Sequence, residues 1–317
     1  MTRYILKRVV LALLTLWLVT AVVFFTTHVL PGNVGLRILG PFAERDAINA
    51  LNEELGMNRP IITQYLDWIG TTLHGDLGQS ILYDEPVSKI LWPALVYSTK
   101  LASMAFLICV PLSILGGVVA ALKRGKLVDR VITVGSLSAA MIPEFVWGVI
   151  FVLVFGVELR WLPVSGLADD GAGPLNQALH LLMPSLCLVL VLFGYIARIT
   201  RAGVIEALDS DYTRTAILKG MSQRQVIWKH VLRNALLPTI AVVASQITYL
   251  IGGLVAIELI FNYPGFGSLL LGSVTYRDYP TLQAAVLITG TIIVTVQLLA
   301  DILFSVLNPR IRQGISS

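Results

Sequence analysis

Three acidic residues, Glu144, Glu258 and Asp301, lie inside or at the edges of long apolar segments. An acidic side chain at the centre of a bilayer costs at least about 2.5–3.5 kcal/mol, so each should face protein or water instead of lipid. Such a side chain could line a translocation pathway or gate. The structural alternative is an interhelical hydrogen bond or a protonated acid, and the polar neighbours of Asp301 favour it there.

The two glutamates lie beside residues that interrupt a helix. Glu144 follows Pro143, so the backbone there can line a cavity. Glu258 precedes the turn that contains Pro264 and Gly265. We predict a pathway or gate at Glu144, Glu258, Pro264 and Gly265, although an ordinary connection between helices would also explain the turn.

Residues 210–238, SDYTRTAILKGMSQRQVIWKHVLRNALLP, form a polar segment between two apolar ones. Its first helix has plausible N-caps in the run 209–211 and a glycine stop at Gly220. Ser222 with Gln225 three residues later then has the spacing of a capping box. The segment predicts a compact helix–turn–helix, either a solvated basic loop or a rigid docking element for a separate ATPase.

Nothing in the chain has the spacing of a catalytic or metal site. The Walker string G-x-x-x-x-G-K-[ST], the H-E-x-x-H motif and the G-x-S-x-G elbow are all absent from the sequence. The histidines are scattered, at His28, His74, His180 and His230. Cys109 and Cys187 lie in apolar runs, where packing between helices explains them best. We expect no enzyme activity, no metal and no cofactor in this chain.

Long apolar segments must position these residues. Of the 317 residues, 56% are hydrophobic and 13% are charged, against about a quarter charged in soluble domains. A helix needs about 20 mostly apolar residues to cross a bilayer. Six segments qualify, so the sequence predicts an all-α, polytopic membrane protein with spans at residues 9–30, 101–122, 131–157, 179–199, 236–261 and 282–307.

The placement of the basic residues predicts the orientation of the spans. With a cytoplasmic N-terminus, 16 of the 23 Lys and Arg residues lie on the cytoplasmic side, while 12 of the 19 Asp and Glu residues lie outside. Both termini are therefore expected in the cytoplasm. The net charge of +4 is too modest and too dispersed for a nucleic-acid binder.

The first external segment, residues 31–100, is long enough to hold helices of its own. Ala47, Ile48, Leu51 and Leu55 have the spacing of one helix face, which Gly56 can end. Pro60 can open a second amphipathic helix. Both helices could lie on the outer membrane surface or cap the bundle.

Short motifs in a fixed order run along nearly the whole chain. Beyond the hairpin they are Gly75–Ser80 (GDLGQS), 142–148 (IPEFVWG), 161–166 (WLPVSG), 258–261 (ELIF), 263–267 (YPGFG), 277–280 (RDYP) and 308–310 (NPR). With DYTRTAILKG and HVLRNALLP in the hairpin, the set resembles the binding-protein-dependent ABC transporter permeases. It resembles in particular the first permease subunit of the dipeptide, oligopeptide, glutathione and nickel importers.

The hairpin departs from the general signature of importer permeases. That signature begins Glu-Ala-Ala, whereas this chain has Arg214-Thr215-Ala216, so only Ala216 and Gly220 match it. The departure is itself similar to the peptide subgroup. Ile217 and Leu218 replace the Arg-Ala that is usual in that subgroup.

The resemblance implies an importer-type (type I) ABC permease fold in a bacterial inner membrane. It implies an anchor helix at 1–30, an external segment at 31–100, a five-span core at 101–307 with a coupling hairpin at 209–235, and a cytoplasmic tail at 308–317. The ATPase-coupling residues would be Asp211, Tyr212, Arg214, Thr215, Ala216, Lys219, Gly220 and His230.

The resemblance also implies partners. These are a second homologous permease, two ATPase subunits that carry ATP and magnesium, and an external binding protein. The substrate would be di- or oligopeptides, with nickel chelates, glutathione or glycosides as alternatives. An ion-coupled secondary transporter would need internal inverted repeats, and an intramembrane enzyme would need paired catalytic residues; neither is evident.

Overall fold

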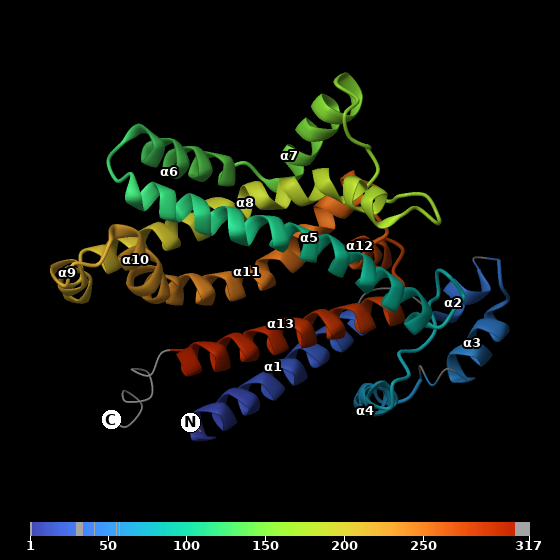
Figure 1. Ribbon diagram of the computed structural model, residues 1–317. Helices are drawn as coiled ribbons and strands as arrows, with labels where there is room; N and C mark the ends of the chain where they lie inside the picture. The colour runs from blue at the N-terminus through green and yellow to red at the C-terminus, as the bar shows by residue number, and fades with distance from the viewer. Residues whose placement is uncertain (1, 30–33, 41, 55, 57, 308–317) are drawn as a thin grey trace.

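The computed structural model of the chain is a bundle of long helices (Figure 1). It describes residues 2–29, 34–40, 42–54, 56 and 58–307. Within these residues the only β pairing is an isolated bridge between Gln79 and Pro86. The helices are α1 (Thr2–Val29), α2 (Val34–Leu39), α3 (Arg45–Glu54), α4 (Ile61–Leu73), α5 (Val87–Leu122), α6 (Leu127–Ala140), α7 (Glu144–Phe151), η1 (Val152–Glu158), α8 (Pro174–Leu208), α9 (Asp211–Leu218), α10 (Gln223–Val226), η2 (Ile227–Val231), α11 (Leu232–Ile260), α12 (Phe266–Thr275) and α13 (Tyr279–Leu307).

The predicted spans correspond to long helices of the structure. Among the described residues, α1, α5, α8, α11 and α13 each contain a stretch long and apolar enough to cross a membrane. The sixth span is a bent pair, Leu127–Ala140 followed by Glu144–Glu158. The all-α, six-span prediction is thus confirmed if the bent pair counts as one span.

The third predicted span, residues 131–157, is not one continuous helix. Its two halves meet at 97° across residues 141–143. Pro143 has no N–H to donate to the preceding turn, and its ring disfavours helical backbone at the residue before it. The indole Nε1 of Trp147 donates to the Ala139 carbonyl at 3.0 Å, which links the two halves across the bend.

The helix that contains the second predicted span begins well before residue 101. Helix α5 starts at Val87 and runs for 36 residues, a length of about 54 Å at 1.5 Å per residue. It therefore extends beyond a hydrocarbon core of about 30 Å. Helix α5 therefore includes the last part of the predicted external segment, and Val87 and Leu91 belong to a buried helical cluster. The boundary at residue 100 stays a prediction.

The amphipathic helices of the first connection exist as α3 and α4. Gly56 ends the α3 region with a positive φ of 69°, and Pro60 is the N-cap of α4, as predicted. Ile48 is buried on the predicted face of α3, while Ala47 is exposed and Leu51 and Leu55 fall outside the described side chains. On α4, Tyr65 packs on Phe24 of α1.

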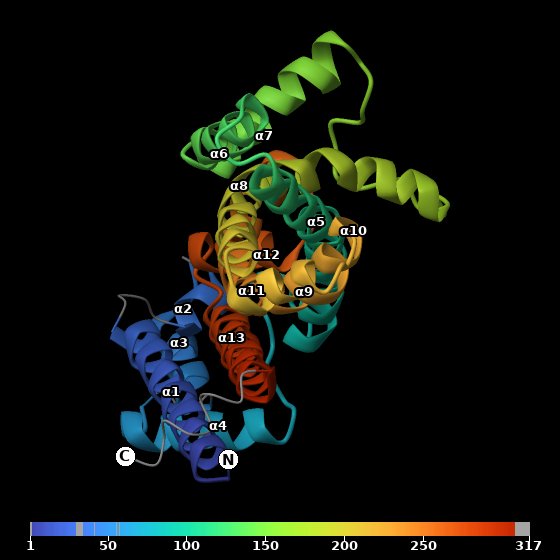
Figure 2. The same ribbon diagram turned by 60° about the vertical axis from the view of Figure 1, so that its left-hand side comes forward.

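The spans form a layered arrangement. Helices α5, α8 and α11 make the middle of the bundle, α1 packs along α13 on one side, and α6 and α7 lie on the other (Figure 2). The largest buried cluster joins α5, α8 and α11 and includes Cys109 and Cys187, both free and packed between helices as predicted. Ion pairs hold the flanks: Asp129 of α6 binds Arg201 at 2.6 Å, and Arg8 of α1 binds Asp301 at 3.0 Å.

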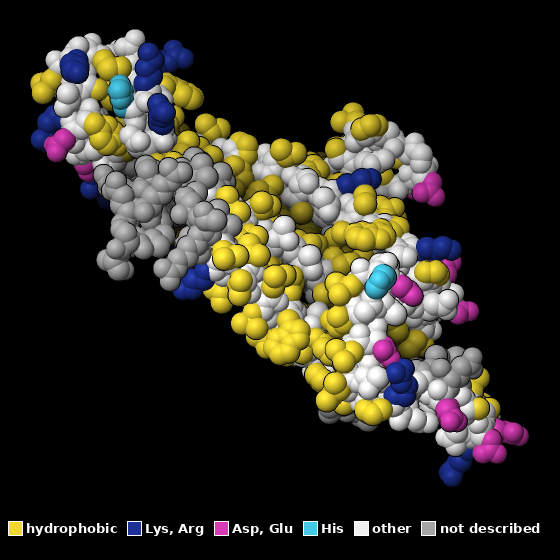
Figure 3. All heavy atoms as spheres, turned by 90° about the horizontal axis from the view of Figure 1, so that it is seen from below, with side chains coloured by type: hydrophobic (Ala, Val, Ile, Leu, Met, Phe, Trp, Pro, Cys, Tyr) yellow, Lys and Arg dark blue, Asp and Glu magenta, His cyan; other side chains and the backbone are white. Residues whose placement is uncertain are grey.

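The two ends of the bundle differ. Helix α1 starts and α13 ends at the side that carries α9 and α10, while α2, α3, α4 and α12 lie at the opposite end (Figure 1). Figure 3 shows a middle band of hydrophobic side chains with charged side chains gathered at both ends. The start of α1 and the end of α13 thus share a side with the hairpin, which agrees with the predicted topology.

Glycines allow the central helices to approach closely. An added Cβ at Gly203 of α8 would lie 2.6 Å from the Ala235 carbonyl oxygen of α11. Backbone atoms cannot move aside as a flexible side chain can, so this contact requires glycine.

We expect Gly203→Ala to lower the thermal unfolding midpoint of the purified protein. Overpacking of a close contact costs about 1–3 kcal/mol. Gly252→Ala is the matched control, because nothing lies within 4 Å of a Cβ at Gly252. The control should keep the midpoint or raise it, since alanine favours a helix by up to about 1 kcal/mol. Equal midpoints for the two variants would contradict the close contact.

Candidate functional site: the α9–α10 hairpin and the Glu258 network

Two elements at opposite ends of α11 contain most of the predicted site residues. The first is the hairpin of α9, α10 and η2. The second, which we name the Glu258 network, consists of Glu258, Ser98, Gly265, Phe266 and Ser268.

The hairpin is closed by the turn chemistry that its sequence predicts. Ser210 precedes α9, although its hydroxyl donates to the Ala207 carbonyl at 2.6 Å and does not cap the helix. Gly220 has a φ of 80°, the left-handed conformation that glycine adopts without strain. Ser222 and Gln225 form the full capping box of α10. The turn between the two helices is therefore rigidly specified.

The second half of the hairpin is continuous with a span. A π-helical turn, η2, joins α10 to α11, so residues from Gln223 to Ile260 form one helical run. The sequence predicted a separate short helix for the second half of the hairpin. In the structure this helix is continuous with the helix of the fifth span. The π-turn inserts a local change of pitch at Trp228, Lys229 and His230.

The hairpin is attached to the bundle by a buried apolar cluster. Ala216 of α9, at 4% exposure, packs with Val226 and Val231 against Val204 of α8 and Ala235 of α11. The hydroxyl of Thr213, which is also buried, donates to the Ala207 carbonyl at 2.7 Å. Movement of the hairpin must therefore carry the ends of α8 and α11 with it.

The outer face of the hairpin exposes large apolar side chains. Leu218 is 82% exposed, Trp228 67%, Ile217 58% and Tyr212 41%. The same hairpin also exposes basic residues, at Arg214, Lys219, Arg224, Lys229 and Arg233. Apolar side chains within a polar rim are typical of a protein–protein interface.

The eight predicted coupling residues differ in their exposure to solvent. Six are exposed on the hairpin, namely Asp211, Tyr212, Arg214, Thr215, Lys219 and Gly220. Ala216 is buried beneath them, and His230 is half-buried on η2. The sequence reasoning did not select Trp228, whose signal was an isolated aromatic residue within a basic segment.

Glu258 is fully buried, and hydrogen bonds occupy both of its carboxylate oxygens. Ser98 of α5 donates its hydroxyl to Oε1, and the backbone N–H of Ser268 donates to Oε2 at 2.9 Å. Ser98 Oγ in turn accepts the N–H of Phe266 at 2.7 Å. The carboxylate thus satisfies the first turn of α12, where N–H groups lack partners and the helix dipole favours negative charge.

Gly265, the N-cap of α12, completes the Glu258 network. A Cβ at Gly265 would overlap the Glu258 carboxylate, so only glycine leaves room for it. Pro264, next to it, is exposed. The network links α5, α11 and α12, and three of the four predicted gate residues lie within it or beside it.

The fourth predicted gate residue, Glu144, lies apart from the Glu258 network. It is the first residue of α7, is half-buried, and has no hydrogen bond or ion pair among the described residues. Its carboxylate faces α11, where an added Cβ at Gly253 would lie 3.5 Å from Oε1. A carboxylate at the bend of a broken span fits the lining of a polar cavity better than the core of the bundle.

Another buried carboxylate, Asp278, was missed by the sequence reasoning. It accepts the hydroxyls of Ser80 at 2.5 Å and Thr281 at 2.7 Å, and the N–H of Ile81 at 3.1 Å. Asp278 therefore joins the first connection to the start of α13. Ser80 and Asp278 belong to two of the short motifs noted above, but their separation in sequence hid the contact.

No group of three or more His, Cys, Asp and Glu side chains in the described part of the chain could hold a metal ion.

Comparison with family models and known proteins gives consistent matches. Residues 113–313 match the family described as binding-protein-dependent transport system inner membrane component, and residues 1–104 match its N-terminal family. A probable peptide ABC transporter permease of Sinorhizobium fredii is 34% identical, over 98% of this chain and 99% of the relative. A putative peptide transport system permease of Brucella abortus is 36% identical, with the same coverage of both chains.

The comparisons also include a glutathione transporter and a solved structure. The glutathione transport system permease protein of Escherichia coli K12 is 34% identical, over 98% of this chain and 99% of the relative. The crystal structure of an amino acid ABC transporter with histidines matches with a TM-score of 0.51 and 16% identity, covering 68% of this chain and 94% of that one. At 16% identity, the structural match supports the fold alone.

We expect Ser98→Ala to destabilise the protein by about 1–3 kcal/mol, because it leaves the Phe266 N–H and a Glu258 oxygen without a partner. The measurement is the unfolding midpoint of the purified protein. Ser103→Ala on the same helix is the control, since Ser103 is exposed and its hydroxyl makes no hydrogen bond among the described residues. A Ser98→Ala midpoint equal to that of the control would contradict the role assigned to Ser98.

Proposed function

The chain belongs to the binding-protein-dependent transport system inner membrane components, the permease subunits of ABC importers, and we propose that its substrates are short peptides. The proposal rests on the peptide transport permeases that are 34–36% identical to it along nearly their whole length. Glutathione, itself a tripeptide, is the second candidate because a glutathione permease is equally similar.

The membrane orientation is part of the proposal. We place the α9–α10 hairpin, the start of α1 and the end of α13 in the cytoplasm, and the α2–α4 connection and α12 outside. The excess of Lys and Arg at the hairpin end supports this orientation through the positive-inside rule. The pathway would then open outward near α12 and inward near the hairpin.

The proposed complex contains a second permease of the same family, two ATPase subunits and an external binding protein. ATP and magnesium would bind to the ATPases, because this sequence has no Walker loop. The exposed Leu218 and Trp228 support docking of an ATPase on the hairpin. The apolar surface of α6 and α7, exposed at Val131, Val134 and Val149, suits contact with lipid or with the second permease.

The proposed mechanism uses α11 as a lever. Closure of the ATPases would displace the hairpin, and the buried Ala216 cluster would pass that motion to α8 and α11. Helix α11 is about 44 Å long, so it reaches from the hairpin to the Glu258 network. The network would shift α12 and α5 together as one body, which makes the turn at Pro264 and Gly265 the outer gate.

Substrate class is tested by reconstituting the permease pair, its ATPases and the binding protein in proteoliposomes. We expect short peptides bound to the binding protein to stimulate ATP hydrolysis and to accumulate in the lumen. Glutathione, nickel chelates and glycosides are tested in parallel. If a nickel chelate or a glycoside is transported and neither peptides nor glutathione are, the proposed substrate class is wrong.

Leu218→Glu should abolish docking of the ATPase. A charge placed in an apolar contact should reduce the amount of ATPase that co-purifies with the permease by about tenfold or more. The unfolding midpoint should not change, because Leu218 is 82% exposed. Leu175→Glu, 77% exposed at the other end of the bundle, is the control and should retain the ATPase. Loss of the ATPase in both variants, or in neither, would argue against docking on the hairpin.

The orientation is tested with a membrane-impermeant maleimide. Cys109 and Cys187 are buried, so background labelling should be low. We expect Glu85→Cys to be labelled in intact spheroplasts and Gln223→Cys to be labelled only after permeabilisation, since both side chains are exposed at opposite ends. The reverse labelling pattern would contradict the proposed orientation.

A further inference from the structure

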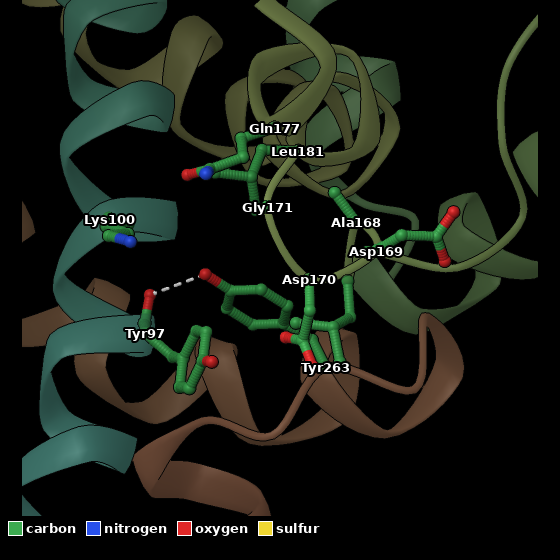
Figure 4. A pocket seen from close by; sticks show the side chains of 11 residues that line it. Tyr97, Lys100, Ala168, Asp169, Asp170, Gly171, Gln177, Leu181 and Tyr263 are labelled. Carbon is green, nitrogen blue, oxygen red and sulfur yellow. Dashed lines mark hydrogen bonds between the residues drawn. The ribbon is translucent and has the colours of Figure 1, made fainter. Parts of the chain in front are cut away.

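A polar cavity of about 120 Å³ lies at the end of the bundle opposite the hairpin (Figure 4). Its walls come from α5, from the connection between η1 and α8, from the start of α8 and from the turn after α11. One water molecule needs about 10–15 Å³ of such volume. The cavity therefore has room for several waters or for the polar end of a small ligand.

The floor of the cavity is fixed by hydrogen bonds. The Tyr263 hydroxyl donates to the Tyr97 carbonyl at 3.0 Å, and the Gly166 N–H donates to the Phe261 carbonyl at 2.6 Å. Burial raises the pKa of the Tyr263 hydroxyl, so it keeps its proton and its role as a donor. The Gln177 side chain is held by its amide nitrogen, which donates to the Ala172 carbonyl at 2.9 Å. The cavity is therefore formed before any ligand enters.

Charges of opposite sign line this cavity without pairing with each other. The Lys100 ammonium lies 5.7 Å from the centroid of the Tyr97 ring and has no ion pair among the described residues. Asp170 lies across the cavity from it, and its carboxylate accepts no hydrogen bond within the described part of the chain. In Figure 4 the neighbouring carboxylate of Asp169 points away from Lys100 and Tyr97.

We propose that this cavity binds the charged ends of a short zwitterionic peptide, with the peptide carboxylate on Lys100 and its ammonium on Asp170. The inference rests on the proposed function, because it assigns a contact site for the same class of substrate at the outer mouth of the pathway. A cation and an anion held apart in a preformed cavity match a ligand that carries both charges.

The experiment combines variants of the protein with variants of the ligand, as a double-mutant cycle does. It uses the full-length permease with its partner permease in nanodiscs, without binding protein and without ATP. Saturation-transfer NMR measures the binding of L-alanyl-L-alanine, of its N-acetylated form and of its C-terminal amide. The protein variants are Lys100→Gln and Asp170→Asn. The controls are Lys89→Gln on the exposed side of α5 and Asp169→Asn, whose carboxylate points away.

We expect each test substitution to weaken binding of the free dipeptide by up to about fivefold, as for exposed charge pairs, because Lys100 and Asp170 are both exposed. N-acetylation should abolish the effect of Asp170→Asn but keep that of Lys100→Gln, and amidation should do the opposite. The control variants should bind as the unsubstituted protein does. The proposal is overturned if the dipeptide does not bind, or if the two substitutions have the same effect on all three ligands.

Failure of this site and failure of the proposed function are distinguishable. Peptide uptake by the complete transporter, together with no dipeptide binding in the cycle, would remove only the cavity site. Absence of peptide uptake would remove the proposed substrate class and, with it, the assignment of this cavity to a peptide.

Discussion

The burial of the Glu258 carboxylate constrains the rest of the bundle. An unpaired carboxylate inside a membrane protein is too costly to persist, so its neighbours must supply donors. Those donors come from the α12 backbone and from Ser98 on α5, so three helices have to meet at one point. Gly265 follows from the same constraint, because any side chain there would occupy the space of the carboxylate.

Helix α11 connects the Glu258 network to the hairpin at the other end of the molecule. Its first residues share the Ala216 cluster with α8 and α9, and its last turn contains Glu258. Close backbone contact at Gly203 and Ala235 prevents α8 and α11 from sliding freely past each other. A helix fixed by packing at one end and by hydrogen bonds at the other transmits displacement with little loss, because packed interiors deform very little.

The sequence predicted the features that depend on local chemistry. The apolar segments located the spans, and the pattern of Ser222, Gln225 and Gly220 located the turn of the hairpin, because caps and left-handed glycines act within a few residues. It did not predict contacts between distant segments. Ser98 is 160 residues from Glu258, and Ser80 is 198 residues from Asp278, so no local pattern connects them. Pro143 indicated the break in the third span, but no local pattern predicted the 97° angle between its halves.

The two residues at which the hairpin differs from the peptide subgroup are, with Trp228, exposed apolar residues of the hairpin. Ile217 and Leu218 stand on the outer face of α9, where water would favour polar side chains. Ala216, one turn from Gly220, is buried and serves the attachment to the bundle. Attachment and exposure are therefore separated by helix face: Ala216, which the general signature shares, faces the bundle, while Ile217 and Leu218, which depart from the subgroup, face outward. A substitution on the outer face therefore leaves the attachment of the hairpin unchanged, because that attachment comes from Ala216 and the other buried residues of its cluster.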